Sequence, residues 1–278
     1  MKAKSRLLSA PYTVWMTIFI VLPMLLVAWF AFTDRAGHFT LENILSVGQY
    51  SNVFLRSIWL GAVATFISLV MGYPLAYIIS KMSAKRQSVM VMLVMLPMWM
   101  NFLLRTYAWM TLLEDNGLIN AALRALGFNG IHMINTAGAV VLGMVYNYIP
   151  YMILPLYSVL TKIDQSVIEA AEDLGANSRQ VFFKVVVPMS MPGIISGVTM
   201  VFVPAVSTFI ISKMLGGGAN LLIGDLIDMQ FLGSAYNPNL GSAISLVLMV
   251  IILICMGIMN QFDDGEEVAE GAEHCGCE

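Results

Sequence analysis

Six long apolar segments constrain this chain more than any other feature of its sequence. A bilayer core about 30 Å thick requires about 20 helical residues to cross it, and each segment is close to that length or longer. Backbone N–H and C=O groups in lipid must pair within their own segment, so helices are the only plausible spanning structures. The sequence therefore predicts an all-α, polytopic membrane protein with six transmembrane helices over roughly 11–32, 58–80, 88–112, 137–160, 190–213 and 241–259.

The composition excludes a soluble protein. Of the 278 residues, 59% are hydrophobic and only 11% are charged. A soluble domain of this size has too little interior to hide that much apolar surface, so lipid must act as the solvent. The first apolar segment follows Lys2, Lys4 and Arg6 but is too long for a cleaved signal peptide, and we expect a retained first helix. The three cysteines predict no disulfide framework.

The positions of Lys and Arg predict the orientation of these helices. If the N-terminus lies inside the cell, the inner segments hold nine of the 14 basic residues: Lys2, Lys4, Arg6, Lys81, Lys85, Arg86, Lys162, Arg179 and Lys184. An excess of Lys and Arg on the inner side predicts that both termini are cytoplasmic. The polar segment 161–189, between the fourth and fifth helices, then also lies in the cytoplasm.

This cytoplasmic segment carries the signals of a helix, a turn and a second helix. Ser166 followed three residues later by Glu169 is typical of a capping box at a helix start. Gly175 falls where a helix would end in a left-handed residue. Asn177 or Ser178 can cap a second short helix, which we expect to stop before Pro188 because proline cannot continue it.

One face of the first short helix is apolar, and Ala170 and Ala171 form a narrow ridge that allows another backbone to approach closely. The apolar face is expected to hold Val167, Ile168, Ala171 and Leu174. An ordinary amphipathic connector would explain this pattern equally well. The residues alone leave the two readings open.

The order of residues in this segment resembles a known loop. Glu169-Ala170-Ala171, then Gly175, then Val185-x-Val187-Pro188 is similar to the EAA loop of binding-protein-dependent ABC importer permeases. That family usually has Ile and Leu at the two valine positions. In the family this loop is a coupling helix that docks in a groove of a cytoplasmic ATPase.

The resemblance implies a type I ABC importer permease fold for residues 1–260, in a bacterial inner membrane. It assigns ATPase coupling to Glu169, Ala170, Ala171, Asp173, Gly175 and Pro188. It also implies four kinds of partner: a second, homologous permease subunit, two ATPase subunits, a periplasmic or extracellular solute-binding protein, and the lipid bilayer. The chain itself would be no enzyme and would bind no cofactor, because ATP and Mg are used by the ATPase; no nucleic acid is expected to bind.

Three further stretches resemble the spermidine/putrescine branch of these permeases. They are PMWMNFLLRTYAW at 97–109, YIPYMILPLY at 148–157 and MLGG at 214–217. Permeases for opines, iron or amino-acid-like solutes share parts of these stretches, so the same role for another small solute remains the alternative. An ATP-independent secondary transporter is a further alternative, but such proteins usually keep an ionisable group at mid-membrane, and we find none in these segments.

Polar and aromatic side chains in the third to fifth helices are candidates for a substrate pathway, because polar groups in membrane helices are costly and usually face a cavity. Pro97, Asn101 and Arg105 recur every four residues, which predicts one stripe on the third helix. Stacked Trp and Tyr attract cations, and carboxylates pair with them. The candidate pathway residues are Trp99, Asn101, Tyr107, Asn147 and Tyr151 in these helices, and Asp225 and Asp228 in the segment before the sixth helix.

Each of these has a plainer structural explanation. Trp and Tyr form interfacial belts, Arg105 can extend to the outer interface, and Asn147 can hold two helices together.

The C-terminal segment 261–278 has seven acidic residues and no Lys or Arg, so we expect a disordered, cytoplasmic tail. Its His274-Cys275-Gly276-Cys277 run would hold a soft metal only weakly, and no metal site is predicted. The residues also predict no catalytic site, because no base and nucleophile are suitably spaced.

Overall fold

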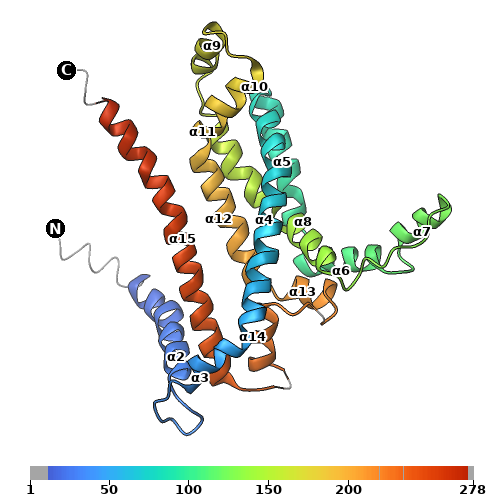
Figure 1. Ribbon diagram of the computed structural model, residues 1–278, viewed down its shortest axis with the longest axis vertical. Helices are drawn as coiled ribbons and strands as arrows, with labels where there is room; N and C mark the ends of the chain where they lie inside the picture. The colour runs from blue at the N-terminus through green and yellow to red at the C-terminus, as the bar shows by residue number, and fades with distance from the viewer. Residues whose placement is uncertain (1–11, 219, 234, 275–278) are drawn as a thin grey trace.

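The computed structural model describes residues 12–218, 220–233 and 235–274, and over these ranges the chain is helical, as predicted (Figure 1). A single β-bridge, Thr33 to Phe39, is recorded in the described part of the chain. The α-helices are α2 (Leu22–Ala31), α3 (Glu42–Val47), α4 (Ser51–Ser80), α5 (Ala84–Met95), α6 (Phe102–Leu113), α7 (Leu118–Ala125), α8 (Ala137–Leu160), α9 (Gln165–Asp173), α10 (Ser178–Val181), α11 (Val187–Met189), α12 (Met191–Ser207), α13 (Ile210–Leu215), α14 (Ile223–Phe231) and α15 (Pro238–His274). Short π-helical segments cover Thr17–Val21 and Phe182–Val186, and 3₁₀ turns cover Gly48–Tyr50 and Leu96–Trp99.

Within the described residues, four helical segments are long and apolar enough to cross a membrane on their own: Tyr12–Ala31, Glu42–Ser80, Ala137–Leu160 and Pro238–Met259. Two further pairs of helices satisfy the same test only when each pair is counted together, which gives up to six spans. The third apolar segment, which we expected to be one continuous helix, is the first of these bent pairs. The expected fifth segment, 190–213, overlaps the second half of the other pair, Met191–Ser207, whereas the first half, Ser178–Met189, lies in the predicted cytoplasmic segment.

The third segment breaks between α5 and α6. Ala84–Trp99 and Phe102–Ala125 meet at 86°. Pro97 lacks an amide N–H and lies in the 3₁₀ turn, and Met100 after it is extended. Asn101 then starts a new helix, because its side-chain oxygen accepts from the Leu103 amide at 2.8 Å. The predicted stripe of Pro97, Asn101 and Arg105 on one helix is therefore wrong.

The fifth segment is interrupted at both ends. Ser178–Met189 and Met191–Ser207 meet at 65° around Ser190. At the other end Thr208 is extended, and α13 begins only at Ile210. Pro204 lies in the last turns of α12 and removes one amide donor there, which weakens the helix near this break.

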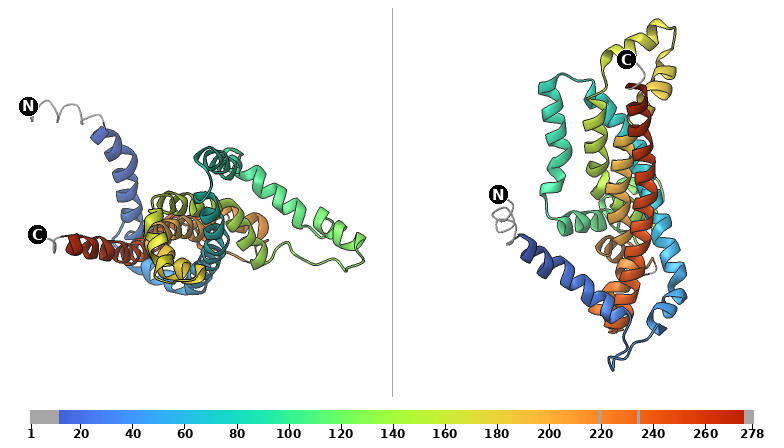
Figure 2. Two further views of the ribbon diagram at one scale, coloured as in Figure 1. Left: turned by 90° about the horizontal axis from the view of Figure 1, so that it is seen from above. Right: turned by 90° about the vertical axis from the view of Figure 1, so that its left-hand side faces the viewer.

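The centre of the bundle is formed by α4, α8 and α12, which pack side by side (Figure 2). Small residues bring their backbones close, as expected where lipid gives no hydrophobic drive for helix association. A Cβ added at Gly193 would lie 3.1 Å from the Pro155 carbonyl oxygen, and one at Gly197 would lie 2.7 Å from the Met152 sulfur. Met144, Met152 and Val201 are fully buried between these helices.

Helices α2 and α15 lie at the side of this centre, and α2 diverges from the bundle (Figure 1). Only 6% of the Tyr12–Ala31 window is buried, against 56% for α8. Most of the surface of α2 therefore faces lipid or another chain.

Helix α15 continues beyond the apolar segment to His274, so the backbone of 261–274 is helical and our expectation of disorder is not met there. Glu and Ala are good helix formers, and the preceding apolar helix removes the cost of nucleation. Cys275 and Cys277, and with them the weak metal-binding run, lie outside the described residues.

A substitution at Gly143 tests the close approach of α8 to α13. A Cβ there would lie 2.5 Å from Leu215 Cδ1 and 2.9 Å from Ile211 Cγ2. We expect Gly143→Ala to destabilise the protein by about 1–3 kcal/mol through overpacking, measured as a lower midpoint of thermal unfolding in detergent. Gly138→Ala in the first turn of α8, with its nearest contact at 3.7 Å, is the matched control and should have little effect. An unchanged midpoint for Gly143→Ala would contradict this packing.

Candidate functional site

The segment between α8 and α12 forms a compact unit of α9, α10 and α11 at one end of the bundle (Figure 1). Helix α9 begins at Gln165, and its cap is Asp164, whose carboxylate accepts from the Ser166 amide at 3.0 Å. This bond lowers the pKa of Asp164. The predicted capping box of Ser166 and Glu169 is wrong, because the helix has already begun before Ser166 and a better acceptor lies two residues earlier.

The turn after α9 follows the prediction. Gly175 has a φ of +85°, in the left-handed region that favours glycine. Its amide donates to the Glu172 carbonyl at 2.9 Å, and the Ala176 amide donates to the Ala171 carbonyl at 3.1 Å. These two bonds form a Schellman motif, which satisfies two carbonyls at the end of the helix.

The second short helix begins at the other predicted signal. Asn177 caps α10 in a reciprocal pair with Gln180: the Gln180 amide donates to Asn177 Oδ1 at 3.0 Å, and the Asn177 amide donates to Gln180 Oε1 at 2.9 Å. The chain then continues past the expected stop. A π-helical segment and α11 carry it to Met189, with Pro188 in the first turn of α11.

Helix α9 turns one side toward the bundle and leaves the rest uncovered. Ile168 is 7% exposed, and Ala171 is partly buried against the core. Leu174, which we expected on the same inward face, is 90% exposed, and Val167 is also exposed. The inward face is therefore narrower than predicted.

The residues assigned to ATPase coupling fall in two places. Glu169, Ala170, Ala171, Asp173 and Gly175 lie on α9 or in the turn after it. All but Ala171 are exposed. Pro188 is exposed too, but it lies in α11 near the bend at Ser190. An acidic, small-residue surface with a fully exposed leucine is thus presented at this end of the bundle.

A second polar region lies where α13 meets α14, at the opposite end of α12. Asp228 Oδ2 and Lys213 Nζ are 2.9 Å apart and form an ion pair. Asp225 lies one turn before Asp228 on α14 and is 5% exposed. Its Oδ2 accepts from the Leu222 amide at 2.9 Å, whereas its Oδ1 is buried and has no hydrogen-bond partner in the described part of the chain.

These side chains line a small cavity. Its volume is about 180 Å³, and the lining residues are Ser212, Lys213, Gly218, Asn220, Leu221, Asp225, Asp228 and Met229. Burial raises the pKa of Asp225. Two carboxyl groups and one ammonium therefore meet here, with an unsatisfied carboxyl oxygen. An added cation would find an acceptor at this point.

The other predicted pathway residues do not join this cavity. Trp99, Asn101 and Tyr107 are exposed along the broken third segment. Asn147 is 2% exposed within α8, and its Nδ2 donates to the Gly143 carbonyl at 2.9 Å. Tyr151 is 38% exposed. Of the seven predicted pathway residues, Asp225 and Asp228 therefore lie together in a cavity, and the other five lie at separate positions.

Contrary to what the sequence suggested, the Arg105 side chain does not extend to an interface with water. The side chain is buried at 7% exposure, and Nε and Nη1 have no partner among the described residues. Its guanidinium lies 6.0 Å from the Phe102 ring centroid. The break at Asn101 explains the difference, because α6 leaves the direction of α5 and turns this side chain inward.

Sequence reasoning also missed Lys213 as part of the acidic region. The sequence shows one basic residue fifteen positions before Asp228, but only the reversal between α13 and α14 brings the two together.

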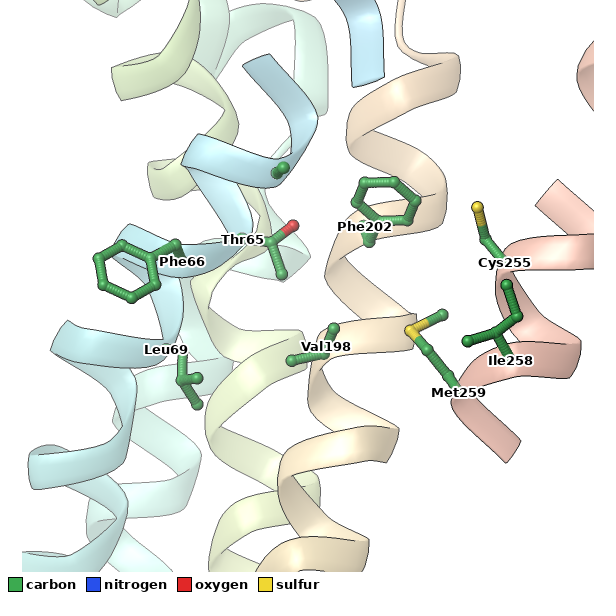
Figure 3. A pocket seen from close by; sticks show the side chains of 9 residues that line it. Thr65, Phe66, Leu69, Val198, Phe202, Cys255, Ile258 and Met259 are labelled. Atoms are coloured by element: carbon green, nitrogen blue, oxygen red, sulfur yellow. The ribbon is translucent and has the colours of Figure 1, made fainter. Parts of the chain in front are cut away.

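Larger apolar cavities lie among the spans. One of about 420 Å³ lies between α4, α12 and α15 and is lined by Ala62, Thr65, Phe66, Leu69, Val198, Phe202, Cys255, Ile258 and Met259 (Figure 3). The Thr65 hydroxyl already donates to the Gly61 carbonyl at 2.7 Å. The lining of this cavity is almost entirely apolar, so it offers almost nothing to a polar solute.

Comparison with known proteins gives a family match over most of the chain and several similar permeases. Residues 2–265 match the family model described as "Binding-protein-dependent transport system inner membrane component". The chain is 39% identical over 250 residues to the spermidine/putrescine transport system permease protein PotB of Haemophilus influenzae, covering 86% of this chain and 87% of that protein. It is 36% identical over 255 residues to PotB of Escherichia coli strain K12, covering 88% and 91%.

Solved structures share the fold at low sequence identity. A subunit of a bacterial ABC transporter that imports the acidic polysaccharide alginate has a TM-score of 0.78 at 17% identity, covering 94% of this chain and 96% of that one. The alginate transporter in complex with its pentasaccharide-bound periplasmic protein has a TM-score of 0.74 at 19% identity, covering 93% and 94%.

The raised pKa of Asp225 predicts a pH-dependent stability. Between the ordinary pKa of 3.8 and the higher folded value, the folded protein holds a proton that the unfolded chain has released. The contribution of Asp225 to the free energy of unfolding therefore falls as the pH rises through the folded pKa. Asp225→Asn keeps an oxygen acceptor for the Leu222 amide but cannot titrate. We expect the midpoint of thermal unfolding of the wild type, relative to that of Asp225→Asn, to rise as the pH is lowered from about 8 toward 3.8, the ordinary pKa of the carboxyl group. Parallel curves for the two proteins would contradict the prediction.

Proposed function

The chain belongs to the binding-protein-dependent transport system inner membrane components, and from this premise we propose that it is the polyamine permease of an ATP-driven importer. The observation that carries the proposal is 36–39% identity over most of the chain to two spermidine/putrescine permeases. The cavity with Asp225 and Asp228 supports it, because its carboxyl groups suit an amine.

Membership of the family fixes the general role. The chain is a multi-pass inner-membrane permease of an ABC importer complex that contains ATPase subunits and a solute-binding protein. It is not catalytic, and ATP is handled by the separate ATPase.

Within this role, we assign the exposed surface of α9 to the ATPase. Glu169, Ala170 and Leu174 are uncovered at one end of the bundle, and small side chains let a partner approach closely. Closure of the ATPase on ATP would then move α9 and, through it, α12. The side of the membrane follows from this assignment: the described end of α15 lies at the same end of the bundle as α9, so both would be cytoplasmic (Figure 1).

The pore requires a second, homologous permease subunit, served by two ATPase subunits. The sparse burial of the Tyr12–Ala31 window supports such a partner, because most of that helix has no neighbour within this chain. A translocation path formed between two chains would also leave residues such as Trp99 and Tyr107 exposed in one chain alone.

The acidic cavity is proposed to meet the cargo on the outer side. Lys213 neutralises one carboxylate, so the region keeps about one negative charge when Asp225 is ionised. That is enough to attract a polycation without holding it tightly, and weak sites favour passage over retention. Tight recognition would belong to the solute-binding protein, and the cation would be released toward the cytoplasm by alternating access.

Gly175→Val tests the coupling role. Nothing lies within 4 Å of a Cβ at Gly175, so the substitution strains the left-handed turn by about 1–2 kcal/mol without creating a clash. We expect uptake by cells to fall strongly, while the binding protein still captures its solute and the permease still reaches the membrane.

The matched control is Gly37→Val. Gly37 also has a φ of +85° with nothing within 4 Å, but it lies in the turn between α2 and α3, at the other end of the bundle. Normal uptake in Gly175→Val, or an equal loss in Gly37→Val, would remove the case for coupling through α9.

The charge of the cargo is tested through the Lys213–Asp228 ion pair. Asp228→Asn and Lys213→Gln both break the pair, but they shift the local charge in opposite directions. For a polycation we expect uptake of labelled spermidine and putrescine to fall severalfold in Asp228→Asn and to be retained in Lys213→Gln, measured as initial rates at low salt. Equal losses in both variants would show that the pair is needed as a structural contact and would argue against attraction of a cation. A wild type that takes up neither amine would assign the permease to another solute.

A further inference from the structure

The chain between the α9 surface and α12 is held at two points by α4, and this contact is not part of the family motif described above. Tyr73 and Tyr77 lie one turn apart near the end of α4 and therefore share a face. Both rings pack edge-on against Phe182, with centroid distances of 5.6 and 5.4 Å and interplanar angles of 89° and 81°. Phe182 is the first residue of the π-helical segment that follows α10.

The second point is a buried hydrogen bond at the bend. The Tyr73 hydroxyl lies 2.8 Å from Ser190 Oγ, and the exposed fractions of the two residues are 7% and 0%. Ser190 Oγ donates its single hydrogen to the Val187 carbonyl at 2.9 Å. The Tyr73 hydroxyl must therefore be the donor to Ser190, which gives the bond a fixed direction.

Ser190 is where the helix direction changes. The 65° bend between Ser178–Met189 and Met191–Ser207 falls on this residue, and its amide is shared between the Val186 and Val187 carbonyls at 3.0 and 3.1 Å. Pro188 has no amide hydrogen, so the backbone here has one donor fewer than a regular helix. A bend with fewer backbone hydrogen bonds is kept at one angle mainly by contacts with other helices. Tyr73 of α4 supplies one such buried contact.

We propose that Tyr73 is a positioning residue for energy coupling: its hydroxyl bond to Ser190, together with its ring contact to Phe182, transfers movement of the α9–α11 unit to α4 and α12. This inference rests on the proposed function, since it requires that the ATPase moves α9. In this proposal the α9–α11 unit pivots between Phe182 and Ser190. Its contact with α4 matters because α4 is one of the three helices at the centre of the bundle. Without the hydroxyl bond, the bend at Ser190 absorbs the movement of α9 before it reaches α12.

The test uses two tyrosines of the same helix. Tyr73→Phe keeps the ring on Phe182 and removes the bond to Ser190. Tyr77→Phe keeps its ring on Phe182 and removes a hydroxyl that has no hydrogen-bond partner among the described residues, so it is the matched control. Ser190→Ala removes the bond from the other side.

Each variant is assembled with the ATPase and the second permease in liposomes, and solute-loaded binding protein is added. The readout is solute taken up per ATP hydrolysed, using whichever of labelled spermidine and putrescine the wild type transports. We expect Tyr73→Phe to lower this ratio by about fivefold, the factor for one lost hydrogen bond, with ATP hydrolysis maintained. Ser190→Ala should lower it at least as much, because it also removes the Ser190 bond to the Val187 carbonyl. The double variant should be no worse than Ser190→Ala alone, because Ser190→Ala has already removed the bond that Tyr73→Phe removes.

Three results would overturn the proposal. The first is an uptake per ATP hydrolysed in Tyr73→Phe equal to that in Tyr77→Phe, and the second is an additive loss in the double variant. The third is a parallel fall of uptake, ATP hydrolysis and complex assembly in Tyr73→Phe, which would show that the bond is purely structural. Gly175→Val in the same assay distinguishes the role of Tyr73 from coupling through α9. If it uncouples and Tyr73→Phe does not, only the role of Tyr73 fails; if Gly175→Val transports normally, coupling through α9 fails.

Discussion

The packing of α4 against α8 and α12 is the interaction on which the rest of this structure depends. In lipid, helices associate through close van der Waals contact, and small residues such as Ala64, Ala76 and Gly197 allow that contact. Because the centre is assembled in this way, one side of α4 is packed against α8 and α12. At one end Tyr73 contacts the bend before α12, and at the other end Ser57 Oγ accepts from the Ile223 amide at 2.9 Å, at the start of α14. One helix thus touches both the unit that carries α9 and the element that carries the acidic cavity.

This arrangement explains why the breaks in the third and fifth apolar segments are tolerated. Unpaired backbone groups at membrane depth are allowed only where protein or a cavity covers them. At Asn101 the side chain satisfies the first amides of α6, and beyond Thr208 the chain is covered by α14. The breaks allow α6 and α13 to turn away from the direction of the spans, and the second break places Lys213 opposite Asp228. Continuous helices would have left these two residues far apart.

The sequence allowed prediction of much that depends on composition or on local hydrogen bonding. Gly175 and Asn177 were identified correctly because a left-handed turn and a reciprocal cap are properties of a few neighbouring residues. Asp164 was overlooked because two acceptors competed for the same helix start, and only the position of the first turn decides between them. The 86° bend after Pro97 was not predictable, since proline in a membrane helix more often produces a modest kink than a change of direction. The burial of Arg105 follows from that bend and was missed with it, and the roles of Ser190 and Phe182 depend on contacts with residues more than a hundred positions away.

The distribution of charge across the described residues bears on how a cation would pass. Of the described Asp, Glu, Lys and Arg side chains, two are buried: Asp225 on α14 and Arg105 on α6. A carboxyl whose charge is disfavoured by burial gains from the arrival of an ammonium group, since the cation restores the ionised form. A guanidinium with two unsatisfied donors has the opposite effect and repels an amine that stays beside it. With one buried group that attracts an ammonium and another that repels it, the described part of the chain offers a polycation little lasting stabilisation. This agrees with the proposal that an external protein selects the cargo and that an ATPase drives its passage.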